Sequence, residues 1–252
     1  MATGVAWRLY QANLRRIFML ECPRPLAVRR GVSFCEAVYE GAKEVEAVEA
    51  VCCQTNDDIH GCWQGGKIAV VVDPLWRTLG QIRTHVVVDA ILAKKNSGTD
   101  VSEAELVVGL GPGFASGQNV HMVVETKRGH DLGRIITSGS AAANTGVPGS
   151  IGGFTGERVL RAPAEGQFRT LREIGEQVKR GEVVGEVAGE NVIAAIDGVL
   201  RGLIRPGSKV QRGLKIGDID PRGIRTYCYT ISDKARAVGG SVLEAVLRVF
   251  PL

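Results

Sequence analysis

The chain has 252 residues, a formal net charge of +4, 44% hydrophobic residues and 23% charged residues, a balance typical of a globular protein of one large or two smaller domains. Aromatic residues make up only 5%, and the positive excess is small, which argues against a nucleic-acid binder. No signal peptide and no apolar run near the roughly 18 residues of a membrane span is visible, so we expect a cytoplasmic protein without membrane partners.

The opening, MATGVAWRLYQANLRRIFMLE, predicts a helix followed by a short strand at 16–21. This is the second half of a β-α-β unit. A dinucleotide-binding fold carries G-x-G-x-x-G/A after its first strand and an acid at the tip of the second. Ala2 would be the last small residue of that pattern, with Thr3 beside it, and Glu21 the acid. The first strand and the two earlier glycines are absent, so a surface acid at a strand end is the alternative.

Four further strands and a helix are expected in the first 157 residues. The strands are at 67–73, 85–89, 105–109 and 120–126, and the helix lies near 56–64. Runs of Val and Ile without alternation are typical of parallel strands covered on both faces. The sequence therefore predicts an α/β fold with a Rossmann-like, mostly parallel sheet over 1–157 whose first strand is missing.

Polar residues gather where these strands end, and ligands of open α/β sheets bind beyond the carboxyl ends of the strands. The candidates for catalysis or binding are Asp89, Lys94, Lys95, Asn96, His121, Glu125, Arg128 and His130. No metal-ligand spacing such as H-E-x-x-H occurs, and the six cysteines form no C-x-x-C pair. No metal site is predicted, and a hydrogen-bonded or surface role is the alternative for each histidine.

Two further segments are candidates for holding an anion. In GLGPGF, the backbone N–H groups near Gly109, Gly111 and Gly113 could converge on a ligand, although the Walker lysine is absent and a tight turn is the alternative. In PLAVRR, Arg29 and Arg30 could hold a phosphate or carboxylate. A solvated basic turn is the alternative there.

The second half of the chain contains an internal repeat. Residues 162–187 align without gaps on 194–219 at an offset of 32, with nine of 26 positions identical. Glycine-bounded short apolar runs predict small β-hairpins, and two such copies resemble the barrel-sandwich hybrid of lipoyl and biotinyl domains. A carrier needs a lysine in the hairpin between the repeats, and the segment 182–200 has none. We therefore predict a structural or interaction β module at 158–222 with no lipoyl or biotin attachment.

The last segment, 223–252, is predicted to contain a helix capped by Ser232, with Asp233 in its first turn. Gly239 and Gly240 interrupt its apolar stripe. A helix-interior glycine costs about 1 kcal/mol relative to alanine, so we expect either a bend or a close helix contact there.

Long strings resemble one family of bacterial and archaeal proteins. They include ATGVAWRL, PLAVRRGVSFCEAVYEG, VVVDAILAKKN, VVGLGPGF, VVETKRGHDLGRII, NTGVPGSIGGFTGERVLRAPAEG and TISDKARAVGGSVLEAV, in order along almost the whole chain. The family is that of the YqeB-type accessory proteins of selenium-dependent molybdenum hydroxylases. Its members begin with a strand and a GAGDLATG-like turn, of which this chain has ATG. We expect the natural protein to continue upstream of Met1 with that strand and turn.

The resemblance implies a maturation factor for molybdenum hydroxylases of the xanthine-dehydrogenase kind, with the hydroxylase or its maturation proteins as partners. A nucleotide-like or molybdopterin-type ligand is the expected cofactor class, and a homo-oligomer stays open. Two other functions stay open: an NAD(P)-dependent oxidoreductase, and a non-catalytic interaction module built on the β repeat.

Overall fold

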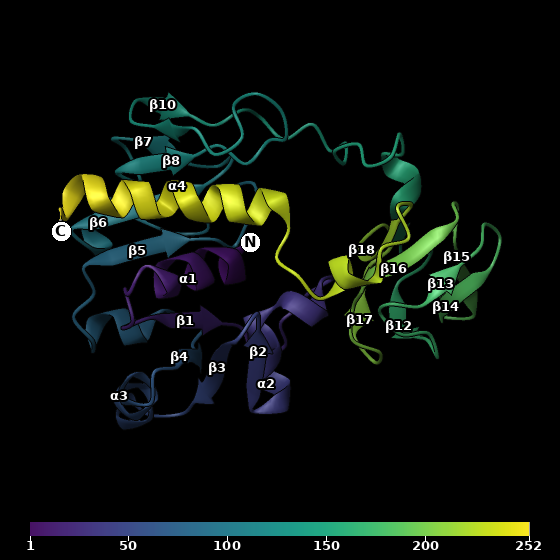
Figure 1. Cartoon of the computed structure of the whole chain (residues 1–252), viewed down its shortest axis with the longest axis horizontal. Helices are drawn as coiled ribbons and strands as arrows, with labels where there is room; N and C mark the ends of the chain where they lie inside the picture. Colours follow the sequence, from purple (N-terminus) through teal and green to yellow (C-terminus); the bar gives the residue numbers. More distant parts are fainter. Residues whose placement is uncertain (252) are drawn as a thin grey trace. The chain divides into compact units, whose positions relative to one another are not determined.

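The computed structural model describes residues 1–251, which form two compact units (Figure 1). Unit 1 contains residues 1–23, 48–145 and 231–251, and unit 2 contains residues 24–47 and 146–230. Neither unit is continuous in the sequence, because the chain leaves unit 1 twice and returns to it twice. The predicted division into 1–157, 158–222 and 223–252 stays a prediction.

Unit 1 carries the α/β part of the chain. Its elements in order are α1 (Ala2–Gln11), β1 (Phe18–Glu21), β3 (Val48–Cys53), α3 (Asn56–Gln64), β4 (Ile68–Val72), η3 (Arg77–Gly80), β5 (Val86–Asp89), η4 (Val101–Glu103), β6 (Leu106–Leu110), β7 (Ala115–Ser116), β8 (Met122–Val124), β9 (Ile135–Ile136), β10 (Gly139–Ser140) and α4 (Asp233–Val249).

The strands of unit 1 belong to separate small sheets. In the first, β4 lies between β1 and β3 and pairs in parallel with both. In the second, β6 lies between β5 and β8 in parallel, and β9 joins β8 as an antiparallel edge. Strands β7 and β10 form a two-stranded antiparallel ladder. The central strands β4 and β6 are the most buried, as the unbroken Val and Ile runs predicted.

The two longer helices with side-chain caps begin where the sequence predicts. Thr55 and Asp58 form a reciprocal capping box at the start of α3, with Asp58 N donating to Thr55 Oγ1 at 3.1 Å and Thr55 N donating to Asp58 Oδ2 at 2.9 Å. The hydroxyl of Ser232 accepts from the backbone N–H of Ala235 at the start of α4. Figure 1 shows α4 as one continuous helix, so the glycine pair produces no break.

Helices α1 and α4 pack closely in unit 1. A Cβ added at Gly239 would lie 2.6 Å from the carbonyl oxygen of Gly4, and one added at Gly4 would lie 2.9 Å from Cβ of Ala235. The close helix contact, rather than the bend, therefore explains Gly239. Val238 and Val242 of α4 share a buried cluster with Val5 of α1 and the apolar face of β6.

Unit 2 is mostly β. Its elements in order are η1 (Arg30–Val32), η2 (Phe34–Glu36), α2 (Ala37–Glu40), β2 (Ala42–Val45), η5 (Gly156–Arg158), β11 (Val159–Arg161), β12 (Gly166–Arg169), β13 (Gln177–Val178), β14 (Val183–Val187), β15 (Glu190–Ile193), β16 (Gly198–Leu203), β17 (Lys209–Val210), β18 (Lys215–Asp220) and η6 (Arg225–Cys228).

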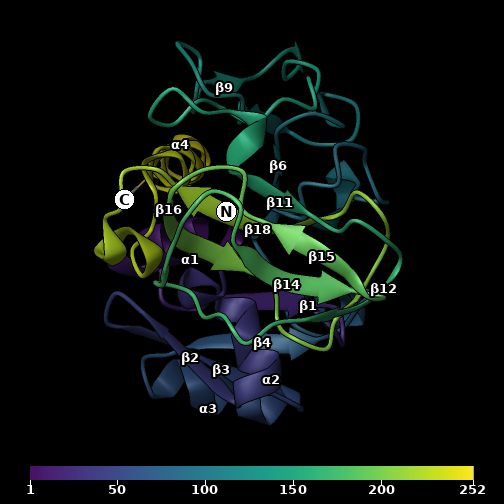
Figure 2. The ribbon, with the colours of Figure 1, turned by 90° about the vertical axis from the view of Figure 1, so that its right-hand side faces the viewer.

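The internal repeat is visible as two matching sets of strands. The offset of 32 residues relates β11 to β15, β12 to β16, β13 to β17 and β14 to β18. The sheets have the orders β11-β18-β16-β13 and β15-β14-β12-β17, so each sheet takes two strands from each copy. Figure 2 shows several of these strands in green. Their core includes fully buried Phe168, Leu200, Leu203, Ile216 and Ile219.

The predicted fold class is wrong. The strands form several small sheets instead of one Rossmann-like sheet followed by a lipoyl-like module. No ladder joins β1 to β5 within residues 1–251, so the parallel strands of unit 1 are not one continuous sheet. Residues 24–47 belong to unit 2, and Val28 packs against its core.

Candidate functional site

The carboxyl ends of β5, β6 and β8 meet at one edge of their sheet in unit 1. The ladder aligns Asp89 with Gly109 and Leu110 with Val124. Glu125 directly follows Val124, so it reaches the same edge. The sequence predicted this gathering, because parallel neighbouring strands end on the same side.

Asp89 and Asn96 shape the loop that follows β5. Asp89 is 7% exposed, and its carboxylate accepts from the hydroxyl of Thr99 at 2.7 Å and from the N–H of Ile91 at 3.0 Å. The amide oxygen of Asn96 accepts from the N–H groups of Gly98 and Thr99, and its nitrogen donates to the carbonyl of Thr99. Both side chains are thus used to fold the loop over residues 89–99.

Glu125 holds two loops by their backbones. It is 4% exposed, and one carboxylate oxygen accepts from the N–H of Lys127 at 2.7 Å while the other accepts from that of Ala142, also at 2.7 Å. A carboxylate whose two oxygens are engaged in this way keeps lone pairs for one further donor on each. The negative charge of Glu125 acts to raise the pKa of nearby Lys234.

Three charged side chains surround this edge. Arg128 forms a two-bond ion pair with Asp233, the first residue of α4, at 2.7 and 2.8 Å. The side chain of Lys234, the next residue, makes no hydrogen bond and no ion pair with any residue of 1–251. Burial lowers the pKa of Lys234, and the charge of Arg128 lowers it further, against the opposite effects of Glu125 and Asp233. Two carboxylates are thus near enough to act on the pKa of this half-buried amine, but neither forms a direct ion pair with it within residues 1–251.

The glycines of GLGPGF satisfy packing needs. A Cβ at Gly109 would lie 2.3 Å from Cγ of Phe114, and one at Gly111 would lie 2.4 Å from Oγ1 of Thr126. Gly111 and Gly113 also have φ angles of +81° and +110°, which favour glycine. The N–H of Gly111 donates to the carbonyl of Val124. The tight-turn alternative thus accounts for this segment more directly than a cradle for an anion.

The remaining candidates of unit 1 are spread around the sheet. His121 accepts from the N–H of Val107 through Nδ1 at 2.9 Å, which ties it to β6. Lys94, Lys95 and His130 are exposed. Ala2 and Thr3 begin α1, and Glu21 ends β1, where burial raises its pKa. The structure places Asp89 and Glu125 at the same edge of the sheet, and it adds Lys234, on which the charges of Glu125 and Arg128 act and which the sequence interpretation missed.

Arg29 and Arg30 belong to unit 2 and contact its backbone. Arg29 donates to the carbonyls of Tyr227 at 2.7 Å and Thr230 at 3.2 Å. Arg30 donates to the carbonyl of Leu203 at 2.8 Å. Burial lowers the pKa of Arg29 to about 10, with a further contribution from nearby Arg201. The two arginines are therefore structural in part, and their predicted role in holding an anion stays a prediction.

A buried network of ion pairs lies beside Arg29. Asp218 pairs with Arg158, with Arg201 at 3.1 Å and with Lys215 at 3.3 Å. Both Asp218 and Arg158 are less than a tenth exposed. Buried charges of this kind are stabilising only while every partner is present. The network couples η5, β16 and β18 of unit 2.

Asp220 is the second acid of the network. It is fully buried and pairs with Arg201 at 3.0 Å and with Arg222 at 2.7 Å. Burial acts to raise the pKa of Asp220, but the hydrogen bonds from Arg222 and the charge of Arg201 outweigh it, so this pKa is lowered. Arg201 thus bridges both acids.

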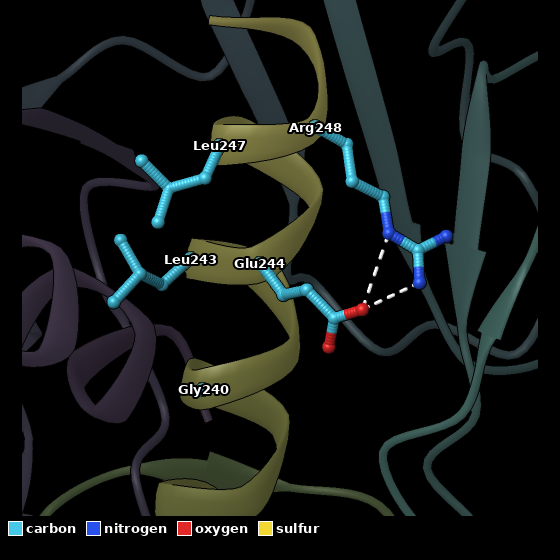
Figure 3. Close-up of a pocket in the computed structure, with 5 residues that line it drawn as sticks. All are labelled: Gly240, Leu243, Glu244, Leu247 and Arg248. Atoms are coloured by element: carbon cyan, nitrogen blue, oxygen red, sulfur yellow. Dashed lines mark hydrogen bonds and ion pairs between the residues drawn. The ribbon is translucent and has the colours of Figure 1, made fainter. Parts of the chain in front are cut away.

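The hollow drawn in Figure 3 does not contain any predicted site residue. It has a volume of about 380 Å³ and lies along α4, lined by Gly240, Leu243, Glu244, Leu247 and Arg248. Leu243 and Leu247 point to one side of the helix, and Glu244 and Arg248 form an ion pair on the other (Figure 3). Because α4 alone supplies every lining residue, this hollow is a surface feature of one helix.

Metal-ligating clusters and membrane-spanning helices are both absent from residues 1–251. That part of the chain has no group of three or more His, Cys, Asp or Glu side chains arranged to hold a metal ion. It also has no helix that is both long and apolar enough to cross a membrane. None of the six cysteines forms a disulfide bond within residues 1–251.

No protein-family model matches the chain. Over 247 residues, or 98% of its length, it is 45% identical to the uncharacterized protein YqeB of Escherichia coli K12. This identity supports a YqeB-type protein. The match covers 46% of that relative, so the chain spans about half the length of the curated protein that it matches.

Three solved structures show limited similarity. An aspartoacylase family protein from Mesorhizobium loti is 20% identical with a TM-score of 0.23, over 25% of this chain and 22% of that one. A succinylglutamate desuccinylase/aspartoacylase from Rhodobacter sphaeroides is 24% identical with a TM-score of 0.23, over 25% and 22%. The ectoine utilization protein EutE (DoeB) from Ruegeria pomeroyi is 14% identical with a TM-score of 0.24, over 34% and 28%.

Proposed function

We propose that this chain is an accessory factor for the maturation of selenium-dependent molybdenum hydroxylases, and that unit 1 binds a nucleotide-like or pterin-like anionic ligand. The maturation part is supported by the family strings that run along the chain, and the 45% identity to YqeB of Escherichia coli supports a YqeB-type protein. The ligand part is supported by the environment of Lys234.

Lys234 supports the proposal of an anionic ligand. Its side-chain amine is half-buried and makes no hydrogen bond or ion pair within residues 1–251. An anionic group beside it would stabilise the charged form, which burial disfavours. Arg128 lies near Lys234 and supplies a second positive charge. Phosphate is an anion that a Lys and Arg pair binds well, and phosphate is common to nucleotides and to the pterin cofactor of molybdenum enzymes.

The maturation part is tested by copurification. A tagged form of this chain should bring down a molybdenum hydroxylase from cells that make both proteins. The selenium and molybdenum content of the hydroxylase should fall when the gene for this chain is deleted and recover when it is restored. Unchanged content of both elements after deletion would contradict the proposal.

The ligand part is tested by thermal unfolding with nucleotides and molybdopterin-type compounds. A ligand that binds only the folded protein raises the unfolding midpoint, and this rise should be lost in Lys234→Met. Lys209→Met removes an exposed lysine of β17 and serves as the matched control, in which the rise should persist. Hydride transfer to or from a nicotinamide would favour the oxidoreductase alternative instead.

A further inference from the structure

A second hollow of unit 1 is lined only by residues whose side chains carry an N–H group. Its volume is about 310 Å³, and it is lined by Arg15, Arg16, His60, Trp63 and Gln64. The two arginines precede β1, and the other three residues belong to the second half of α3. Each of the five side chains carries an N–H group and none is acidic, a composition that suits an anion.

The walls of this hollow are fixed to one another. The indole N–H of Trp63 donates to the carbonyl of Ile17 at 2.9 Å, which ties α3 to the segment before β1. The ring of His60 meets that of Trp63 edge-on, with 5.3 Å between the ring centroids. The indole is therefore held in place at the hollow before any ligand binds.

Arg15 is also held in place. Its guanidinium lies 4.0 Å from the ring centroid of Tyr10 and donates to the side-chain oxygen of Asn13 at 3.0 Å. The hydroxyl of Tyr10 in turn donates to the carbonyl of Gly66, just beyond α3. Because these contacts exist without a ligand, less side-chain freedom is lost when an anion binds.

Arg16 has donors left for a ligand, whereas the N–H of His60 is already used. Arg16 is exposed and makes no hydrogen bond or ion pair with the described residues. His60 Nδ1 lies 2.7 Å from the carbonyl oxygen of Asn56. A carbonyl only accepts, so Nδ1 carries the hydrogen and uses it on this backbone contact, and His60 is a wall of the hollow rather than a donor to the ligand.

We propose that this hollow binds the phosphate group of a phosphate monoester, with Arg15 and Arg16 contacting the phosphate oxygens and the Trp63 ring beside the group that carries the phosphate. The site is separate from Lys234 and does not depend on the proposed function. The shared chemistry is a tetrahedral dianion, which free inorganic phosphate and a nucleoside monophosphate both present.

Titration of the tryptophan fluorescence tests the proposal with three probes: inorganic phosphate, adenosine 5′-monophosphate and adenosine. We expect both phosphate-bearing probes to bind and adenosine to bind at least tenfold more weakly than its monophosphate. Tighter binding of the monophosphate than of inorganic phosphate would assign a phosphate ester as the ligand, and equal binding would assign free phosphate. Adenosine binding as tightly as its monophosphate would overturn the proposal.

Variants complete the test. Arg16→Gln should weaken binding of both phosphate probes by about tenfold or more, which corresponds to 1.4 kcal/mol or more. Arg83→Gln, which changes an arginine of the same unit with an 84% exposed side chain, should leave binding unchanged. Trp63→Phe should abolish the fluorescence response while calorimetry still detects phosphate binding. Unchanged phosphate binding in Arg16→Gln would overturn the proposal. Lys234→Met should leave phosphate binding at this hollow unchanged, which separates this site from the proposed function.

Discussion

Gly239 of α4 and Gly4 of α1 lie so close that a Cβ at position 239 would come within 2.6 Å of the Gly4 carbonyl oxygen. The next residue, Gly240, has no heavy atom within 4 Å of its hypothetical Cβ. Two adjacent glycines of one helix therefore have opposite environments, and this difference gives a matched pair of substitutions.

Gly239→Ala should destabilise the protein by about 1–3 kcal/mol, because the new methyl group forces α1 and α4 apart. Gly240→Ala should stabilise it by up to about 1 kcal/mol, because alanine favours the helix and meets open space. Urea unfolding of both variants measures the difference. A stabilising effect of Gly239→Ala would show that the helices are not packed as described.

Lys234→Met should raise the stability of the ligand-free protein. Because the folded-state pKa of Lys234 is lowered, the unfolded chain binds the proton more tightly, and the lysine contributes an unfavourable term at neutral pH. In the wild type this term decreases as the pH rises through the folded pKa toward the unfolded value near 10.4. The free energy of unfolding of Lys234→Met, measured from pH 7 to pH 10, should lack that rise. Matching pH profiles for the two proteins would contradict the prediction.

Asp218→Asn should strongly destabilise unit 2. The substitution leaves Arg158, Arg201 and Lys215 without the carboxylate that they share, and breaking a buried ion pair in this way costs about 3–5 kcal/mol. Asp197→Asn is the control, since its pair with Lys179 is exposed and such pairs contribute about 1 kcal/mol or less. Chemical unfolding of both variants compares the two losses. A loss of equal size in both would mean that burial of the network matters little.

The free energy of unfolding of unit 2 should decrease at low pH because Asp220 becomes protonated. Because the folded-state pKa of this carboxyl is lowered, its contribution to stability is complete above the unfolded value near 4 and decreases as the pH falls through the folded pKa. Asp220→Asn should therefore be less stable than the wild type at pH 7, and the gap should narrow below about pH 4. Unfolding followed by circular dichroism at pH 3 to 7 measures the gap, and a gap that does not change with pH would refute the assignment.

Local features of the fold were predictable from the sequence, and long-range ones were not. The helix at 56–64 and the Ser232 cap follow from neighbouring residues, and both are confirmed. The pairing of β1 with β4 and of β5 with β6, in separate sheets, depends on contacts far apart in the chain. The prediction of a single sheet failed there, because strand-like runs do not specify their partners.

The candidate site shows the same division. Strand ends identified Asp89 and Glu125, because the direction of parallel strands decides where such residues gather. Lys234 lies more than 100 residues after Glu125 in the sequence, and nothing in the local string SDKAR distinguishes it from a helix-start lysine. Arg29 likewise contacts Tyr227, 198 residues away. Such partners become visible only in the folded chain.

The interleaved strands of unit 2 have a consequence for synthesis on the ribosome. Strand β11, near the start of the first copy, pairs with β18, the last strand of the second, and β13 pairs with β16. Within the first copy β12 and β14 can pair with each other, but β13 lacks its partner until β16 has left the exit tunnel, and β11 lacks its partner until β18 has left it. Exposed edges of this kind invite aggregation, so a ribosome that stalls inside the second copy would release a fragment that is prone to aggregate.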